Sequence, residues 1–579
     1  MSFQPNFYAG PRYLSDGRCE FVMHAPDANS LSLTFTNDGI NWFTRPMQNL
    51  GNGDYYLVDG EVKPGARYWY VIDDVDGYPD PWSRFQPDGP HSASQVISGA
   101  EYNWHDQHWF GHSWNEAVIY ELHVGAFTKQ GTFLAAIDKL KLLQELGITV
   151  VQIMPIWTVP GGPSWGYDAN YMFSVNAEYG QPDDLKRFVD AAHSLGIQVI
   201  LDVVYNHLGI EGNYLSKFDR TWLRQDDGNQ WGAKLNFDKP GFENARNLVV
   251  SNALFWLREY HLDGLRIDAP IAIEDGSKTH ILTELAETVR NNFSEGRHIH
   301  LLLENDHYAG RITDGFDDLL YDGSTNIKGG ECLVELFQGD SGGFDVKKTA
   351  SLMDCLKGNI GFDFNAEFPT RTDAVKFLHS DRQTLGLQSH DLIGNSHDPQ
   401  RIWANLEGLK RELALAIMCL TPSLPTFFMG DEFTCDQVFP FFCKFSDVNE
   451  AEVLQGRIED FQFSENLLDY WSPYSRDTFE AATLDWPDNS SLKCNANYQL
   501  IGRLLKIRQQ FIMPLSESGR IVSSNYLLSD DRHQVSWDYQ SGRTLIFELT
   551  VNRIEKTGWE QSSFFWLDGE SWSARWSIV

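Results

Sequence analysis

The sequence has little cysteine, few basic residues and no long apolar run, and each shortage excludes a class of protein. Only seven of its 579 residues are cysteine; they are scattered, and no two form a Cys-x-x-Cys pair. Paired spacings mark zinc sites and disulfide scaffolds, so we expect neither. Reduced thiols in a cytoplasmic protein fit this pattern best. The sequence therefore predicts a cytoplasmic location and no bound metal.

Basic residues are outnumbered by acidic ones. Lysine and arginine total 46 against 80 aspartates and glutamates, which gives a formal net charge of −34. This balance argues against nucleic acid and anionic membrane surfaces as partners, because both attract basic surfaces. No apolar run approaches the length of a membrane span, and the N-terminal residues lack the basic start and apolar core of a signal peptide. A neutral substrate is the natural expectation, and the sequence indicates no oligomeric state.

Aromatic residues, by contrast, are plentiful. They make up 13% of the chain and include 19 Trp and 22 Tyr. Trp and Tyr combine a flat apolar face with a polar tip, which suits stacking on sugar rings. They also fill cores, and at this length we expect two to four domains with large cores. Sugar binding and core packing are both open at this level.

Short β-rich stretches separated by Asp, Asn, Gly and Pro fill residues 1–105. This spacing predicts an N-terminal β-sandwich, which we interpret as carbohydrate-binding-like. A β-like pattern returns in residues 511–579 and predicts a second, C-terminal β-sandwich. The intervening residues 106–510 have a different pattern and are expected to form the catalytic domain.

In this central part, short apolar strands alternate with amphipathic helices, which is typical of βα repeats. The predicted strands are 117–124, 149–154, 197–204, 263–268, 299–304, 316–321, 385–389 and 425–429, and the predicted helices are 132–146, 183–195, 242–260, 279–292, 347–357 and 409–420. Eight such units close into a (β/α)8 TIM barrel of the α/β class, with its active site at the C-terminal ends of the strands. A polar insert at about 208–240 follows the third strand, and its length indicates a functional segment.

Polar residues gather at the predicted strand ends. They are Asp202 and His207 at the end of the third strand, Arg266 and Asp268 at the fourth, Glu304 at the fifth, His390 and Asp391 after the seventh, and Tyr167 and Asp168 in the loop after the second. Because these ends meet at one mouth of a barrel, the side chains are expected to converge there. Unrelated structural ion pairs would not all fall at the same ends.

Paired carboxylates that flank a bond are the apparatus of glycoside hydrolysis. Asp268 lies two residues beyond Arg266, so both side chains leave the strand on one face, and the guanidinium favours the ionised form that a nucleophile needs. Read alone, this pair could equally be a buried structural ion pair. Glu304 follows three leucines, an apolar lead-in that favours the protonated form of a general acid. Asp391 is expected to hold sugar hydroxyls and help distort the ring.

These motifs, in this order and spacing, resemble the alpha-amylase family of glycoside hydrolases, a retaining (β/α)8-barrel family. Segments 202–207 and 264–269 resemble its first two signatures, and 390–391 resembles its fourth. The resemblance implies that Asp268 is the nucleophile, Glu304 the acid/base and Asp391 the transition-state stabiliser. It also implies sugar contacts by Tyr167, His207, Arg266 and His390, with Asp168 beside them in the same loop.

Within this family, nearly the whole chain is similar to the maltooligosyltrehalose trehalohydrolases, for example in segments 79–87, 120–125 and 428–433. That likeness implies hydrolysis of the α-1,4 bond next to the terminal trehalose of a maltooligosyl trehalose, with release of trehalose and without cofactor or metal. The 120–125 motif is shared with branching enzymes, so a glucan branching enzyme or another α-glucan transglycosylase or hydrolase is the alternative. A non-catalytic glycan-binding protein is a third hypothesis, which the catalytic residues disfavour.

The chain departs from the trehalohydrolase pattern on the side of the leaving group. The departures are Ile271, Ser389, Lys444 and the segment 315–320 around the sixth strand. The nucleophile, acid and stabiliser are all present. The leaving sugar, trehalose or another glucan end, is therefore the open point.

Several neighbours of these motifs have two interpretations. Asp202 either organises the loop after the third strand or takes part in catalysis. Trp165 either stacks on a sugar or packs its own loop. Asp306, two residues past the acid, is a candidate for binding acceptor hydroxyls. His193 is interpreted as an ordinary surface or core histidine.

Overall fold

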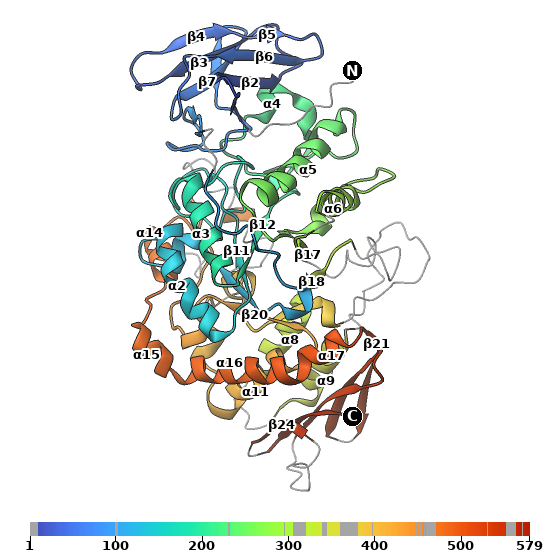
Figure 1. The fold of residues 1–579 in the computed structure, drawn as a ribbon. Coiled ribbons are helices and arrows are strands. Elements are labelled where there is room, and N and C mark those ends of the chain that lie inside the picture. The colour runs from blue at the N-terminus through green and yellow to red at the C-terminus, as the bar shows by residue number, and fades with distance from the viewer. Residues whose placement is uncertain are drawn as a thin grey trace.

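A computed structural model describes most of the chain. It covers residues 10–98, 102–229, 232–293, 296–304, 320–337, 344–358, 380–396, 398–445, 450, 454–456, 458, 471–529, 531–551, 563–569 and 571–579, without the side chains of 225–229. In Figure 1 the N-terminal sheets lie at the top, the barrel in the middle and the C-terminal sheet at the bottom.

The predicted (β/α)8 barrel is confirmed. Its eight parallel strands close in chain order. They are β10 (Ile119–Leu122), β11 (Val150–Ile153), β12 (Gln198–Val203), β16 (Gly264–Ile267), β17 (His300–Leu303), β18 (Gly323–Thr325), β19 (Gln383–Gly386) and β20 (Leu424–Phe428). All strands therefore direct their C-terminal ends to one mouth, as the site prediction requires.

Two of these strands lie elsewhere than predicted. The sixth was predicted at 316–321, but β18 begins only at Gly323, and most of the predicted segment lies outside the described residues. The strand reads Gly-Ser-Thr, so it carries no apolar signal. The seventh begins two residues early because Gln383 and Thr384, although polar, are strand residues buried in the barrel.

Helices surround the barrel. They are α2 (Phe133–Leu146), α3 (Pro182–Ser194), α5 (Phe242–Glu259), α6 (Ile281–Asn292), α8 (Ile327–Phe337), α9 (Val346–Lys357) and α11 (Gly408–Leu420). Except for α8, which was not predicted, their ends agree with the predicted helices within two residues. Local capping explains this accuracy: Thr132 accepts a hydrogen bond from the Ala135 N–H at the start of α2, and Gly147 ends the helix in the left-handed region, at φ 111°.

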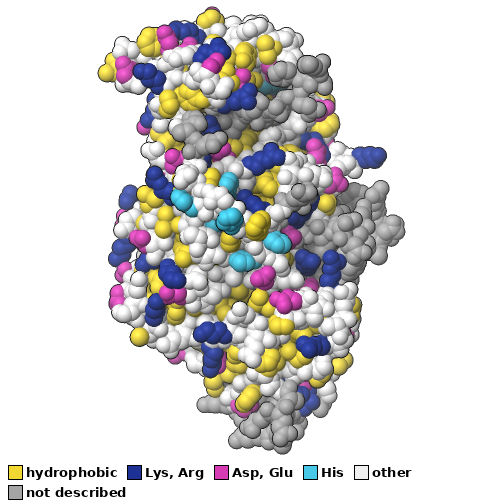
Figure 2. Space-filling view, in the orientation of Figure 1, with side chains coloured by type: hydrophobic (Ala, Val, Ile, Leu, Met, Phe, Trp, Pro, Cys, Tyr) yellow, Lys and Arg dark blue, Asp and Glu magenta, His cyan; other side chains and the backbone are white. Residues whose placement is uncertain are grey.

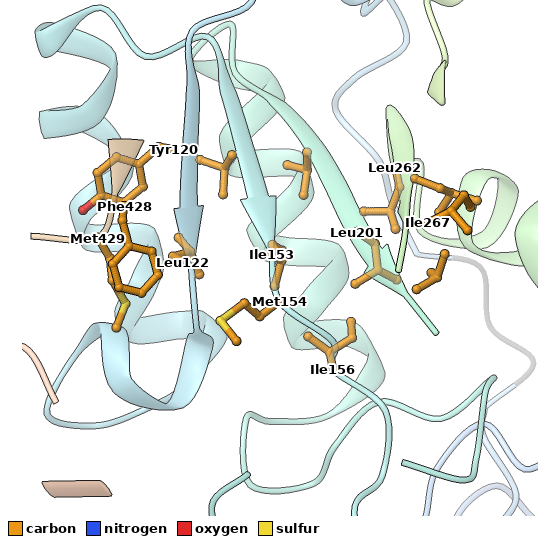
Figure 3. Close-up of a cluster of buried hydrophobic side chains, with 14 of the residues drawn as sticks. Tyr120, Leu122, Ile153, Met154, Ile156, Leu201, Leu262, Ile267, Phe428 and Met429 are labelled. Atoms are coloured by element: carbon orange, nitrogen blue, oxygen red, sulfur yellow. The ribbon is translucent and has the colours of Figure 1, made fainter. Parts of the chain in front are cut away.

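The barrel strands have two faces with different tasks. Outward-facing residues such as Leu122, Ile153 and Leu201 form an apolar layer against the helices (Figure 3). Near the N-terminal ends of the strands, the inward-facing residues form a separate apolar cluster with two residues that precede β10. The cluster consists of Trp114, Ala117, Ile119, Val150, Ile200, Leu302 and Leu424. Two residues further along, the same inward face carries Glu121, Gln152, Asp202, Arg266, Glu304 and Thr426. A packed apolar floor thus lies beneath a polar layer at the mouth.

The N-terminal strands form two antiparallel sheets, as a sandwich requires. One contains β1 (Arg12–Tyr13), β2 (Cys19–His24), β6 (Asp54–Asp59) and β5 (Gln48–Asn49); the other contains β4 (Phe43–Pro46), β3 (Leu31–Thr36), β7 (Arg67–Ile72), β8 (Asp76–Tyr78) and β9 (Ser94–Gln95). Alternate residues of β2 and β3, such as Phe21 and Leu33, are buried between the sheets.

The predicted insert at 208–240 connects this sandwich to the barrel. It contains α4 (Leu215–Phe218) and a small sheet of β13 (His207–Leu208), β15 (Gly232–Leu235) and β14 (Leu223–Asn229). Trp222 packs against Trp82, with ring centroids 4.9 Å apart, and Phe218 packs against Tyr70 at 6.1 Å. The insert begins at His207, a predicted site residue, so it joins the sandwich to the barrel mouth.

The C-terminal strands form one five-stranded antiparallel sheet. It contains β21 (Ile521–Ser529), β22 (Arg532–Tyr539), β23 (Thr544–Thr550), β25 (Ser573–Ile578) and β24 (Ser563–Asp568). Helix α9 contacts it: the Trp537 indole N–H donates to the Leu356 carbonyl at 3.2 Å, and Ser524 donates to that of Lys357 at 2.7 Å. In the described residues α9 lies where a second sheet was predicted. The boundaries 1–105, 106–510 and 511–579 stay predictions.

The surface reflects the composition. On the face shown in Figure 2, acidic and basic side chains are interspersed, without a continuous basic patch. Within the ranges given above, no helix is both long and apolar enough to cross a membrane. Nor does that part of the chain contain a group of three His, Cys, Asp or Glu side chains that could hold a metal ion.

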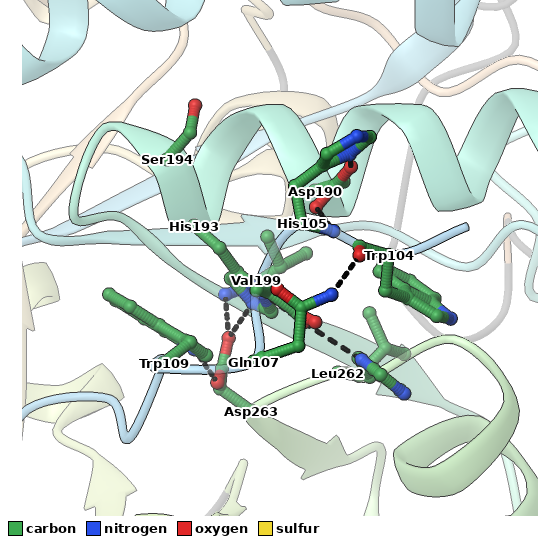
Figure 4. A network of polar contacts seen from close by, with 12 residues as sticks. Trp104, His105, Gln107, Trp109, Asp190, His193, Ser194, Val199, Leu262 and Asp263 are labelled. Atoms are coloured by element: carbon green, nitrogen blue, oxygen red, sulfur yellow. Dashed lines mark hydrogen bonds and ion pairs between the residues drawn. The ribbon is translucent and has the colours of Figure 1, made fainter. Parts of the chain in front are cut away.

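A buried polar network lies near the N-terminal ends of the barrel strands (Figure 4). His193 on α3 is 5% exposed, and its two ring nitrogens each lie 2.9 Å from a carboxylate, Asp106 and Asp263. Trp109 stacks on the His193 ring at 4.6 Å and donates its indole N–H to Asp263. Because both ring nitrogens face acceptors, the imidazole must carry both protons. Burial alone would lower the His193 pKa, but the two carboxylates outweigh it and raise the pKa.

We predict that His193→Gln destabilises the protein in a pH-dependent way. A histidine whose pKa is higher in the folded than in the unfolded chain stabilises fully below the unfolded pKa and loses this contribution as the pH rises through the folded value. The loss should be about 3 kcal/mol at pH 6 and smaller at pH 9, because glutamine removes the positive charge that lies between the two buried carboxylates. Thermal unfolding at the two pH values measures it.

His105→Gln is the matched control for this prediction. His105 is the chain neighbour of Asp106 and pairs with Asp190 on α3 at 2.7 Å, but its side chain is 71% exposed. We expect little change at either pH. Equal destabilisation of the two variants, or a His193→Gln effect that grows with pH, would contradict the assignment.

Candidate active site

Three carboxylates lie at the barrel mouth where the strand order places them. Asp268 directly follows β16, Glu304 directly follows β17, and Asp391 lies in the first turn of α10 (His390–Gly394), shortly after β19. Their side chains are 13%, 15% and 35% exposed, respectively. They are therefore shielded but accessible from the mouth.

One buried guanidinium connects two of these carboxylates with a third acid. Arg266 Nη1 bonds Asp202 Oδ2 and lies 3.7 Å from Asp268 Oδ1, whereas Nη2 lies 3.3 Å from Glu304 Oε1. The side chain is only 4% exposed, so these interactions are weakly screened by solvent. The sequence paired Arg266 with Asp268, but its closest partner is Asp202.

The carboxylates raise one another's affinity for protons. Burial, together with Glu304 and Asp202, raises the pKa of Asp268 well above its ordinary value, although Arg266 opposes the shift. Burial likewise raises the Asp202 pKa to about 6, against the lowering effect of Arg266 and His390. The expectation that Arg266 alone keeps Asp268 ionised is therefore incomplete. Because the acids share little positive charge, Asp268 and Asp202 hold protons more tightly than isolated carboxyls do.

The backbone after Asp268 is strained. Ala269 lies in the left-handed region, at φ 36° and ψ 57°, which is unfavourable for a residue with a Cβ. This conformation directs the Ala269 N–H to Glu304 Oε2. Asn206 donates to Asp268 Oδ2 at 3.1 Å. Each carboxyl thus has its own donor, and the two are held in fixed orientations.

Tyr167 and His390 form the opposite wall of the site. Their rings stack, with centroids 5.3 Å apart, and the Tyr167 hydroxyl donates to Asp202 at 2.8 Å. The same hydroxyl oxygen accepts from His390 Nε2 at 2.8 Å, and that nitrogen lies 3.3 Å from Asp391. The structure therefore brings these predicted sugar-binding residues together with the catalytic carboxylates.

The other predicted binding residues differ in their positions. His207 is buried, and its Nε2 lies 2.9 Å from the Tyr167 carbonyl, so it supports the wall. Burial lowers its pKa to about 4, which keeps it neutral. Asp168 accepts from Ser164 at 2.5 Å within its own loop, which gives it a loop-holding contact. Asp306 lies outside the described residues, and its binding role stays a prediction.

The two interpretations of Asp202 and Trp165 can now be separated by their contacts. Asp202 is 1% exposed and bonds both Arg266 and Tyr167, so it organises the site from below. Trp165 is 2% exposed and stacks on Phe439 at 5.5 Å, so it packs its loop.

Sequence reasoning missed two supporting residues. Asn206 lies within the segment 202–207, and the sequence assigns it no role, yet it donates to Asp268. Glu121 on β10 is 4% exposed and bonds His390 Nδ1 at 2.6 Å. A charged residue in the middle of a predicted buried strand is the signal that could have identified Glu121, because such a residue needs a partner.

Two cavities lie near the site. A small one of about 50 Å³ lies below the mouth, between Glu121, Arg266 and His390. A larger one of about 740 Å³ lies between α14 (Arg476–Ala482) and the loop at 162–163, and none of the three catalytic carboxylates lines it. The predicted catalytic carboxylates therefore lie at the barrel mouth and not in the larger cavity.

Comparison with known proteins agrees with this geometry. Residues 109–231 match the family described as alpha amylase, catalytic domain. A malto-oligosyltrehalose trehalohydrolase of Saccharolobus solfataricus is 31% identical over 89% of this chain and 90% of its own. A 1,4-alpha-glucan branching enzyme of Corynebacterium jeikeium is 35% identical over 44% of this chain and 38% of its own. A crystal structure from Salmonella typhimurium, assigned as an alpha amylase, superimposes with a TM-score of 0.83 at 28% identity and covers 98% of this chain and 99% of that one.

We predict that Arg266→Lys lowers kcat on an α-glucan at least about 10²-fold. A lysine ammonium cannot reach Asp202, Asp268 and Glu304 with the planar geometry of a guanidinium. Steady-state hydrolysis assays measure the effect. The control is Arg290→Lys on α6, because Arg290 bonds the Leu320 carbonyl and Asp322 away from the site. We expect it to keep normal activity; wild-type kcat in Arg266→Lys would refute the bridging role.

Proposed function

Because this chain belongs to the malto-oligosyltrehalose trehalohydrolase family of alpha-amylase-type glycoside hydrolases, we propose that it hydrolyses the α-1,4 bond next to the terminal trehalose of a malto-oligosyl trehalose and so releases trehalose. The observation that carries the proposal is the group of Asp268, Glu304 and Asp391 at one barrel mouth. Its substrate is an α-glucan oligosaccharide, and its location is cytoplasmic, which fits seven cysteines that form no disulfide within the described residues.

The reaction proceeds by double displacement. Glu304 donates its proton to the glycosidic oxygen while Asp268 attacks the anomeric carbon, so the glycosidic bond breaks as an Asp268–carbon bond forms. A water molecule then attacks that carbon, gives its proton to Glu304 and releases Asp268. Asp391 accepts hydrogen bonds from sugar hydroxyls during both steps. The contact of Arg266 with both reacting carboxyls supports the short separation that retention requires.

The proton count of the site suits this division of roles. Burial and the neighbouring carboxylates raise the pKa of Asp268, so this residue holds a proton more tightly than an ordinary aspartate. When the glycosidic oxygen lies beside Glu304, that oxygen accepts this proton through the Glu304 carboxyl. Asp268, held by Asn206 and close to Arg266, is then ionised for attack.

We predict that substitutions separate the two roles. Asp268→Asn should lose hydrolysis of every substrate by at least about 10⁴-fold, because no nucleophile is left. Glu304→Gln should lose hydrolysis of maltotriosyl trehalose but keep a fast initial burst of phenol release from an aryl α-glucoside with an acidic phenol, because such a leaving group needs no proton. Turnover after the burst should slow, because no base is left for the attacking water. Comparable losses of Glu304→Gln on both substrates would refute the acid role.

A product profile tests the substrate. With maltotriosyl trehalose we expect trehalose and maltotriose, and proton NMR should show the α-anomer of maltotriose first, because double displacement retains configuration. Maltopentaose, of equal length but without trehalose, is the matched control and should be cut more slowly. Equal rates on both, or a β-anomer, would overturn the substrate or the mechanism, respectively.

The alternative is a glucan branching enzyme or another α-glucan transglycosylase or hydrolase with a different leaving group. The match to a branching enzyme over 44% of the chain favours it as a second candidate. Such an enzyme would change the iodine stain of amylose without producing new reducing ends. The proposed hydrolase would instead produce one reducing end for each bond cut.

A further inference from the structure

We propose that Glu121 is a positioning residue that keeps His390 in its doubly protonated form, so that the imidazolium holds Asp391 and Tyr167 in place for catalysis. Glu121 lies on the first barrel strand and His390 lies after the seventh. The pair therefore connects two parts of the chain that are far apart in the sequence.

The hydrogen bonds define the protonation of His390. Glu121 Oε1 accepts from His390 Nδ1 at 2.6 Å and from the His390 backbone N–H at 3.1 Å. On the other side of the ring, the Tyr167 hydroxyl already donates its proton to Asp202, so its oxygen can only accept from His390 Nε2. Both ring nitrogens therefore face acceptors, and only the imidazolium satisfies both.

Burial makes this arrangement depend on charge. Glu121 is 4% and His390 1% exposed, so neither has bulk water as a substitute partner. A buried cation with its anionic partner removed is strongly disfavoured. Gln152 donates to the second Glu121 oxygen at 3.4 Å, which helps fix the carboxylate.

The groups that act on the His390 charge come from several elements. They are Glu121 and His123 at the first strand, Tyr167 after the second, Asp202 at the third, Arg266 at the fourth and Asp391 on α10. Burial alone would lower the His390 pKa, but Asp391 and Glu121 raise it to about 9, against Arg266. Asp391 belongs to the proposed catalytic group and can contact substrate, whereas Glu121 is buried and contacts only protein groups. Glu121 is therefore the fixed part of the balance.

The consequence for catalysis is a fixed positive charge beside Asp391. His390 Nε2 lies 3.3 Å from Asp391 Oδ2, and the Asn395 amide donates to Oδ1 at 2.9 Å. A neutral His390 with its proton on Nδ1 would present a lone pair to Asp391 and Tyr167. Asp391 would then turn away from the sugar hydroxyls, and the hydroxyl of Tyr167 would lose a donor.

The test is Glu121→Gln, which preserves shape and an acceptor oxygen but removes the charge. The first readout is NMR titration of ¹³C-labelled histidines in the intact protein, with the His390 signal identified by its absence in His390→Gln. In the wild type, His390 should stay protonated beyond pH 8. In Glu121→Gln its midpoint should fall by about 1–3 pH units, the shift that one adjacent opposite charge produces.

The second readout is the pH dependence of kcat/KM on an α-glucan that the enzyme cleaves. The alkaline limb should move to lower pH in Glu121→Gln, and activity at pH 7 should fall about 10–100-fold, as for other supporting partners of a site residue. Glu121→Asp, which keeps the charge, should restore most of the alkaline limb. This readout rests on the proposed function, but the titration does not, so the two can fail independently.

Glu432→Gln is the matched control. Glu432 is 1% exposed and accepts from Tyr120, the neighbour of Glu121 on β10, but it does not contact His390. It should leave both the His390 titration and the alkaline limb unchanged. A wild-type His390 midpoint at or below pH 6.5, or a Glu121→Gln variant that loses activity equally at every pH without moving that midpoint, would overturn the proposal.

Discussion

The active site depends on one guanidinium shared among three carboxyls. Arg266 contacts Asp202, Asp268 and Glu304 from a position that is almost fully buried. Without it, these acids would repel one another at distances where the interior screens charge poorly. With Arg266 between them, Asp268 and Glu304 can lie close enough to act on one glycosidic bond. The rest of the barrel mouth is arranged to place this side chain and to limit its freedom.

The barrel places Arg266 through the alternation of inward-facing and outward-facing residues along its strands. On β10, β11, β12, β17 and β20, an inward position of the apolar floor is followed, two residues later, by a polar position at the mouth, so Ile200 precedes Asp202 and Leu302 precedes Glu304. Parallel register sets Asp202 opposite Arg266 on neighbouring strands. A floor of packed side chains therefore fixes the height of the charged layer. The insert that packs on the N-terminal sandwich begins at His207, next to Asn206, which links that domain to the residues around Asp268.

The sequence was sufficient to predict the barrel, most helix ends and the convergence of the carboxyls at its mouth, because each has a local signal. Apolar strands, caps and acids at strand ends are all readable in short windows. The sixth strand was missed because Gly323–Thr325 carries no apolar residue. The closest partner of Arg266, Asp202, was missed because a spacing of two residues reveals neighbours on one strand, whereas Asp202 lies on the neighbouring strand. His193 was interpreted as ordinary because its two carboxylates are far away in sequence.

The balance of charges at the barrel mouth explains why its acids need both Arg266 and His390 as partners. Within the part of the chain that the structure describes, the acids Glu121, Asp202, Asp268, Glu304 and Asp391 face two cations, Arg266 and His390. Burial and the neighbouring acids raise the pKa of Asp268. A glycosidase of this type needs one ionised and one protonated carboxyl at the same pH. The excess of carboxyls over cations favours a proton on one of them. Asn206 donates to Asp268 and the Ala269 N–H donates to Glu304, so the two carboxyls have different surroundings.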